Sequence, residues 1–196
     1  MKANGPIETF YHLNTPHSIA LLADFHNGDP EPVLNSLKKQ KPDIIAVAGD
    51  IIFSERPKGN CSLQIDDNPN AVDLLRSCVR IAPTFISIGN HEFMFRSEDR
   101  KVITSTGAAL LNDSWITCND ICIGGLNSAN YNAYQVLRTQ FPEYELYPKP
   151  NKQVLSKKLE PNLGWLDEFE KQTGYKILLC HHPEYYPLHL KDRRID

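Results

Sequence analysis

The sequence predicts a single α/β domain, in which buried strands alternate with amphipathic helices. Apolar runs of the length of a buried strand recur along the chain, at residues 18–23, 43–48, 84–88 and 176–180. Helical patterns separate several of these runs, an alternation typical of a sheet covered by helices. With 196 residues, of which 41% are hydrophobic and 23% charged, the chain can build one substantial core and is short for two. No repeat or linker divides it, so we expect one domain over residues 1–196.

The helices are predicted from apolar periodicity and from their start signals. The first covers residues 31–40, and a second begins at Asn68-Pro69, a cap residue followed by a first-turn proline. A short third helix begins at Ser97, where the acidic residues that follow suit the helix dipole. A fourth helix is expected over residues 163–172.

The remaining chain predicts a hairpin and two loops. The hairpin covers residues 115–124, where two apolar runs flank the turn pair Asn119-Asp120. Residues 53–67 and 127–162 have the least regular patterns, and we expect them to be loops.

Charge, targeting signals and cysteines argue against several classes of protein. The formal net charge is −3, so the chain as a whole offers no basic surface for nucleic acid or an anionic membrane. The N-terminus has no apolar signal-peptide core, and no stretch approaches the ~18 apolar residues of a membrane span. We therefore expect a cytoplasmic protein with no membrane span and no nucleic-acid partner. The five cysteines are scattered and odd in number, which favours reduced thiols over a disulfide framework or a structural zinc site.

Each of the four apolar strands runs directly into polar side chains. The segments that follow the strands are Asp24-Phe25-His26, Gly49-Asp50, Gly89-Asn90-His91-Glu92 and His181-His182-Pro183. In an open α/β sheet the carboxyl ends of the strands line the ligand crevice, so we expect these side chains to meet there.

The side chains in these segments suit a metal site. Asp24 and His26 are two residues apart, so in extended backbone both side chains point the same way and can hold one ion. Asp50 is a carboxylate that could bridge two ions, and imidazole nitrogen with carboxylate or amide oxygen suits Mn, Fe, Zn, Co or Ni. Taken singly, each segment also fits an ordinary turn, since Gly-Asp is a common turn pair. Four such segments at strand ends, in this order, favour the metal site.

This ordered set of segments resembles the calcineurin-like metallophosphoesterase family, from Ile19 to the C-terminus. Glu92, which follows Gly-Asn-His, makes the chain most similar to the bacterial branch of that family. The resemblance implies two β-sheets packed face to face between helices, a four-layer α-β-β-α sandwich with two divalent metal ions at one rim. It also implies hydrolysis of phosphomonoester or phosphodiester bonds through a hydroxide that bridges the two ions.

The resemblance further implies which residues hold the metals. Asp24, His26 and Asp50 would bind the first ion. Asp50 would bridge to the second ion, which Asn90 and His181 would also bind.

The substrate contacts follow from the same resemblance. His91 would contact the phosphate and assist the leaving group without binding metal, and Glu92 would orient the His91 ring. Asn90, His91 and His182 would bind the substrate.

Members of the family also carry a Gly-His-x-His segment after the His181 loop, and this sequence runs to Asp196 without one. The resemblance therefore implies a fold incomplete at its C-terminus, lacking two metal ligands and the strands that close the second sheet. His189 is a poor substitute, because it lies in a polar segment with no glycine and no second His two positions away. We expect a partial or impaired form of a complete enzyme. The alternatives are a catalytically inactive binding scaffold with this fold and a protein that binds one metal without catalysis.

The shared motifs do not identify the substrate. We expect a phosphate ester of a small molecule or a lipid-linked phosphate, selected by the loops 53–67 and 127–152. Four tyrosines in the second loop could stack on a base or line an acyl groove, although packing within the loop is the plainer explanation. They are Tyr131, Tyr134, Tyr144 and Tyr147. The oligomeric state and the identity of the metals stay open.

Overall fold

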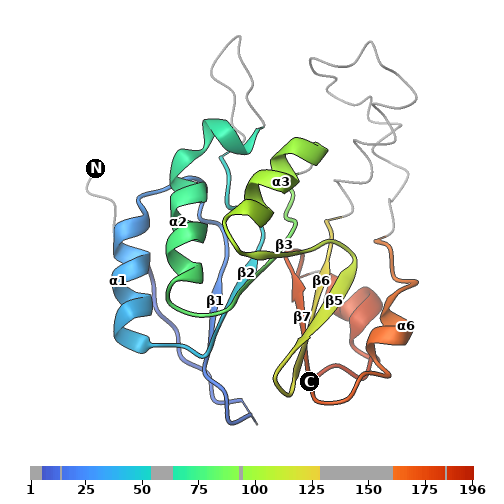
Figure 1. The fold of residues 1–196 in the computed structure, drawn as a ribbon. Helices are drawn as coiled ribbons and strands as arrows, with labels where there is room; N and C mark the ends of the chain where they lie inside the picture. Colours follow the sequence, from blue (N-terminus) through green and yellow to red (C-terminus); the bar gives the residue numbers. More distant parts are fainter. Residues whose placement is uncertain (1–5, 14, 54–63, 93–94, 129–160, 184) are drawn as a thin grey trace, which may run out of the picture.

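The computed structural model describes residues 6–13, 15–53, 64–92, 95–128, 161–183 and 185–196, which form two β-sheets packed face to face (Figure 1). The first sheet is parallel throughout, in the order β1-β2-β3-β4. Its strands are β1 (Ile19–Leu22), β2 (Ile44–Ala48), β3 (Thr84–Ser87) and β4 (Ala109–Leu111). In the second sheet, β5 and β6 form an antiparallel hairpin and β7 runs parallel to β6. These strands are β5 (Ser114–Cys118), β6 (Ile121–Leu126) and β7 (Tyr175–Cys180).

Helices cover the outer face of each sheet (Figure 1). The first sheet carries α1 (Pro30–Gln40), α2 (Pro69–Val79) and α3 (Ser97–Ser105), and the second carries α6 (Leu166–Phe169). This α-β-β-α layering confirms the predicted fold class. Two single turns complete the described structure, a 3-10 turn at Ile65–Asp67 and a π-helical turn at Tyr186–Leu190. Among the described residues, no helix combines the length and apolar character needed to cross a membrane.

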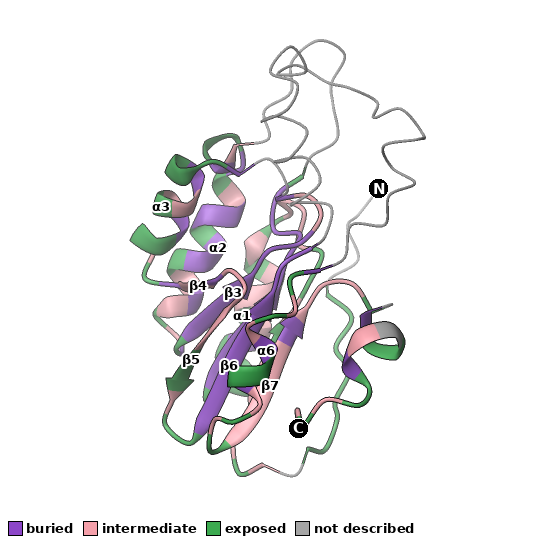
Figure 2. Ribbon diagram, turned by 90° about the vertical axis from the view of Figure 1, so that its right-hand side faces the viewer, coloured by how far each residue is buried: buried purple, intermediate pink, exposed green. Residues whose placement is uncertain are grey.

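The strand β2 is buried on both faces, which explains its unbroken apolar sequence. Ile45 and Val47 pack towards the helices, whereas Ile44 and Ala46 pack towards the second sheet. This alternation follows from the two-residue period of a strand. Burying each of the larger side chains stabilises the fold by about 1.5–3 kcal/mol. Figure 2 shows that β3 and β6 are buried in the same way.

The strand β6 contributes side chains to two apolar clusters, one on each face of the second sheet. Ile121 and Ile123 pack against the first sheet, and Cys122 and Leu126 pack on the other side, where they belong to the same cluster as Leu166 of α6. The second sheet therefore packs through apolar side chains on both faces, against the first sheet on one side and against α6 on the other.

Two predicted elements differ from the structure. The helix expected over residues 163–172 is reduced to α6, because the turns at its two ends are of the 3-10 type. Leu166 N donates to the carbonyl of Leu163, and Gln172 N donates to that of Phe169, both at 3.0 Å. The strand β4 has no counterpart in the prediction, since three residues are too few to show a period.

Asn68 precedes α2 as predicted, but its side chain does not cap the helix. Its Oδ1 accepts a hydrogen bond from Phe53 N at 2.9 Å, and its Nδ2 donates to the carbonyl of Gln64 at 3.0 Å. The side chain therefore ties the segment after β2 to the start of α2. Most of the predicted loop 53–67 lies outside the described residues, as do residues 129–160 with their four tyrosines.

Candidate metal centre

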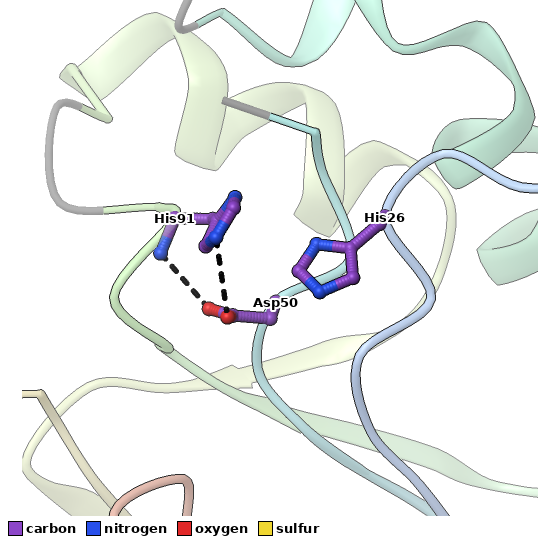
Figure 3. A group of neighbouring side chains, drawn as sticks. All are labelled: His26, Asp50 and His91. Atoms are coloured by element: carbon purple, nitrogen blue, oxygen red, sulfur yellow. Dashed lines mark hydrogen bonds and ion pairs between the residues drawn. The ribbon is translucent and has the colours of Figure 1, made fainter. Parts of the chain in front are cut away.

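The carboxyl ends of four strands meet at one edge of the sandwich. β1, β2 and β3 are parallel neighbours, so the residues that follow them lie side by side, and the residues after β7 join them from the second sheet. Two groups of side chains that could hold a metal ion result, and within each group the potential ligand atoms lie within 4.8 Å of one another. The groups are His26, Asp50 and His91 (Figure 3), and Asp24, Asp50 and His181. Asp50 belongs to both.

The Asp50 carboxylate is buried, with 2% of the residue exposed. Its Oδ1 accepts a hydrogen bond from the backbone N of His91 at 2.9 Å. Its Oδ2 lies 3.1 Å from Nε2 of His181 and 3.7 Å from Nε2 of His91. Burial acts to raise the pKa of Asp50, but the hydrogen bonds from His181 and the His91 amide outweigh it and hold the pKa below its ordinary value. The residue is therefore a charged carboxylate that faces both groups.

Backbone carbonyls hold two histidine rings in one tautomer. Nδ1 of His26 lies 3.2 Å from the carbonyl oxygen of Ile52, and Nδ1 of His181 lies 2.9 Å from that of Ala48. Because a carbonyl oxygen can only accept, each Nδ1 carries a hydrogen. Nε2 of each ring is left to face the site, which is the usual arrangement of histidines that bind a metal.

Nε2 of His181 faces two oxygens at once, Oδ2 of Asp50 at 3.1 Å and Oδ1 of Asn90 at 3.0 Å. An unprotonated nitrogen beside two acceptor oxygens is repelled by both, so a cation or a proton belongs among them. The hydrogen bond to Asp50 raises the pKa of His181 to about 9, against the opposing effect of burial. Imidazole, carboxylate and amide oxygen together form a donor set that fits a divalent transition metal.

The loops that carry these ligands adopt left-handed backbone. The described part of the chain has seven non-glycine residues with positive φ, and four of them lie here: Asp24 (55°), His26 (48°), Asn27 (52°) and Asp50 (53°). Such conformations cost about 1–3 kcal/mol each and gather at functional sites. The sequence predicts extended backbone at Asp24 and His26, and the structure corrects this. A turn, not a strand, brings Nε2 of His26 to 3.5 Å from Oδ1 of Asp24.

Two glycines allow the loops after β2 and β3 to approach each other. Gly49 has a φ of 77°, and a Cβ atom there would collide with the backbone of Gly89. A Cβ atom on Gly89 would collide with the Asp50 side chain. Close approach of the two loops is what lets Asp50 reach the backbone N of His91.

Comparison with known protein families agrees with this geometry. The family model for calcineurin-like phosphoesterases matches residues 17–195. The chain belongs to the calcineurin-like phosphoesterase family. A search of curated proteins finds no match. Calcineurin-like phosphoesterases are in general metal-dependent enzymes that act on phosphate esters, and the two groups around Asp50 give this member a candidate site for divalent metal.

His91 lies beside His26 and Asp50 in one of the two candidate groups. One ring nitrogen is within 4.8 Å of the ligand atoms of His26 and Asp50, and its ring centroid is 4.5 Å from that of His26. Burial lowers the pKa of His91 by more than the nearby Asp50 raises it, so the ring is neutral at neutral pH. A neutral ring can donate a hydrogen bond to a phosphate oxygen, and it can equally bind a metal.

Glu92 is fully buried next to His91 in the chain. Its carboxylate accepts hydrogen bonds from the backbone N of Asp50 (2.8 Å), Gly89 (2.9 Å) and Ile52 (3.1 Å). Burial and the charge of Asp50 raise the pKa of Glu92 to about 7, while these three backbone hydrogen bonds act in the opposite direction. Glu92 therefore joins the loops after β2 and β3 to each other.

Two further histidines lie outside both ligand groups found among the described residues. Nε2 of His182 lies 2.6 Å from Oγ of Ser128, and the ring of His189 contacts that of Tyr185 with centroids 5.9 Å apart. No sequence signal identifies Ser128, or the two carbonyl oxygens that hold the histidine rings, because a lone serine and a backbone carbonyl have no motif of their own.

Proposed function

We propose that the protein is a phosphoesterase whose site holds two divalent metal ions. Asp24, His26 and Asp50 would bind the first ion, and Asp50, Asn90 and His181 the second. The orientation of two histidine rings carries the proposal. Backbone carbonyls take both Nδ1 hydrogens, which leaves both Nε2 atoms beside carboxylate oxygens. The donor set suits Mn, Fe, Zn, Co or Ni.

Bound divalent ions would neutralise charge on the phosphate and lower the pKa of an attacking water. The chain has a net charge of −3, so attraction of an anionic substrate has to be local to the site. His91 is neutral and faces the site, and it is placed to donate a hydrogen bond to a phosphate oxygen or to the departing oxygen. Glu92 holds the loop amides in place behind these groups.

The proposed substrate is a phosphomonoester or phosphodiester of a small molecule, lipid-linked phosphates included. Asn90, His91 and, by the sequence resemblance, His182 are its candidate contacts. All three would bind the phosphate group, so they do not distinguish one ester from another.

The test is hydrolysis of p-nitrophenyl phosphate and bis(p-nitrophenyl) phosphate by protein that has been stripped with a chelator and then reloaded with Mn²⁺. We expect hydrolysis only after reloading. Asp50→Asn should lower kcat/KM by more than about 100-fold, because it removes the charge shared by both groups. His91→Gln should lower kcat by about 100-fold while metal content is retained. Hydrolysis that survives the chelator, or that Asp50→Asn leaves intact, contradicts the proposal.

A catalytically inactive binding scaffold with the same fold is the second candidate. A scaffold predicts no hydrolysis with any of the metals named above, whether or not metal binds. Metal content measured beside hydrolysis separates the two candidates.

A further inference from the structure

The proposed ligands of the second ion come from both sheets. Asn90 follows β3 in the first sheet, and His181 follows β7 in the second. Their side chains nevertheless meet, with Nε2 of His181 3.0 Å from Oδ1 of Asn90. The separation of these two atoms depends on what holds the two loops together across the sandwich.

Ser128 contacts both loops and is buried, with 1% of the residue exposed. Its backbone N donates a hydrogen bond at 3.2 Å to the carbonyl of Ile88, in the segment that leads to Asn90. Its hydroxyl oxygen lies 2.6 Å from Nε2 of His182, the immediate neighbour of His181. One buried residue thus ties the loop that carries one ligand to the loop that carries the other.

The His182 end of this link is tightly packed. The ring stands edge-on to that of His181 (centroids 5.3 Å apart, 79° between planes) and is tilted against that of Tyr185 (5.1 Å, 42°). The His182 carbonyl accepts hydrogen bonds from Tyr185 N at 3.1 Å and from Sγ of Cys180 at 3.3 Å. A displacement of the His182 ring would therefore move His181 as well.

The Ser128 end is anchored to the second sheet. The neighbouring residue Asn127 donates its backbone N to Oδ1 of Asp113 at 3.0 Å, and its side chain donates to Asn112. Both Asn127 and Ser128 come directly after β6, which is paired with a strand on each side. The Ser128 hydroxyl therefore has a fixed position from which to hold His182.

We propose that Ser128 and His182 form a positioning pair that sets the spacing of Asn90 and His181, and with it the metal affinity of the site these two ligands share. The inference rests on the proposed function, because the spacing matters only if Asn90 and His181 bind one ion. It gives His182 a task other than contact with phosphate. A phosphate contact would leave metal affinity unchanged in the absence of substrate.

The experiment is a Co²⁺ titration of the metal-free protein without substrate, followed by visible absorption and by calorimetry. His181→Ala identifies the binding step that belongs to the shared site. Ser128→Ala removes the hydroxyl, and His182→Phe keeps a ring but removes Nε2. His182→Gln is the conservative variant, because its terminal amide reaches the position of Nε2 and can still bond to Ser128.

Ser87→Ala is the matched control. Ser87 is a buried serine at the end of β3, close to the site, and its hydroxyl has no hydrogen-bond partner among the described residues. It therefore tests the loss of a buried hydroxyl without the loss of a link between the loops.

We expect Ser128→Ala and His182→Phe each to weaken Co²⁺ binding at the shared site by about tenfold, and to shift its absorption bands, because the ligands move apart. The double variant should be no weaker than either single one, since both remove the same interaction. His182→Gln should bind Co²⁺ nearly as tightly as the wild type, and Ser87→Ala should match the wild type in affinity and spectrum.

Unchanged affinity and spectrum in both Ser128→Ala and His182→Phe overturn the inference and leave the proposed function standing. Losses that Ser87→Ala shows equally, or that His182→Gln fails to restore, also overturn it, because they indicate general destabilisation. If the wild-type protein binds no Co²⁺, the proposed function fails, and the inference fails with it.

Discussion

At the scale of single residues, Nε2 of His181 is the central atom of the proposed second metal site, because it faces Asp50 and Asn90 together. With its pKa raised to about 9, the ring carries a proton at neutral pH, and this proton must leave before a metal can bind. We predict that metal loading near neutral pH releases a proton and that affinity rises about tenfold per pH unit until the ring's pKa is reached. Calorimetry in two buffers of different ionisation enthalpy measures the release.

The control for this proton is His17, whose ring pairs with Asp120 away from the site, at 2.5 Å. His17→Gln should leave the release unchanged, whereas His181→Gln should remove one proton from it. Equal binding enthalpies in the two buffers would show that no proton is displaced. In the metal-free protein, the ion pair of His181 with Asp50 stabilises the fold fully below pH 6.5. Its contribution is lost as the pH rises through about 9, where His181 loses its proton.

The Glu92 carboxylate is the shared acceptor for three buried backbone amides. We predict that Glu92→Ala lowers the free energy of unfolding by at least about 2 kcal/mol, because buried N–H groups would lose their acceptor. Urea unfolding of the metal-free protein measures the change. Glu98→Ala, on the exposed face of α3, is the control and should change stability little. If the two substitutions had equal effects on the free energy of unfolding, the proposed role of Glu92 as the acceptor that joins the two loops would be wrong.

At the scale of the elements, the close approach of the loops after β2 and β3 depends on Gly89. We predict that Gly89→Ala destabilises the fold by roughly 2–4 kcal/mol and lowers the metal content of the purified protein, because the new Cβ atom collides with Asp50. Thermal unfolding and metal analysis measure the two effects. Gly164→Ala is the control, since its Cβ atom would meet only Asn162 Oδ1, at an ordinary 3.7 Å. Normal metal content in Gly89→Ala would contradict the prediction.

The strands that lead to the site could be predicted from the sequence, whereas some of the other elements could not. β2 and β3 are buried on both faces, so their apolar runs identify them without any knowledge of their neighbours. The strand β4 exists because β3 offers it a partner, and α6 is short because its flanking turns tighten into 3-10 geometry. The strand β4 and the length of α6 both depend on contacts with other residues, which the local sequence pattern does not reveal.

At the scale of the whole molecule, part of the candidate site could be predicted from the sequence and part could not. The side chains that converge could be predicted, because they follow strands whose ends meet at one edge of the sandwich. The groups that orient them could not. The carbonyl that holds the His181 ring belongs to Ala48, 133 residues earlier in the chain. Likewise, the left-handed turn that joins Asp24 to His26 is stabilised by backbone bonds to the loop after β2, such as His26 N to the carbonyl of Asp50 at 3.0 Å.

Metal should also stabilise the whole fold, because the unfolded chain cannot bring ligands from both sheets together. We predict that Mn²⁺ raises the melting temperature of stripped protein, with a gain of about 2.7 kcal/mol when Mn²⁺ is at 100 times its dissociation constant. Differential scanning calorimetry with and without Mn²⁺ measures the gain. Asp50→Asn, which weakens both ligand groups, should show little gain, and an equal gain in this variant would mean that Mn²⁺ binds elsewhere.

The pairing of His181 with Asn90 joins residues 91 positions apart in the chain, and this has a kinetic consequence. Contacts between such distant segments close large loops at an entropic cost, so we expect this pairing to form late in folding and to be weak in the transition state. An ion bound there would slow unfolding and leave the folding rate nearly unchanged. The metal would then determine how long each folded molecule survives between openings, and so how long it escapes proteases that cut the opened chain.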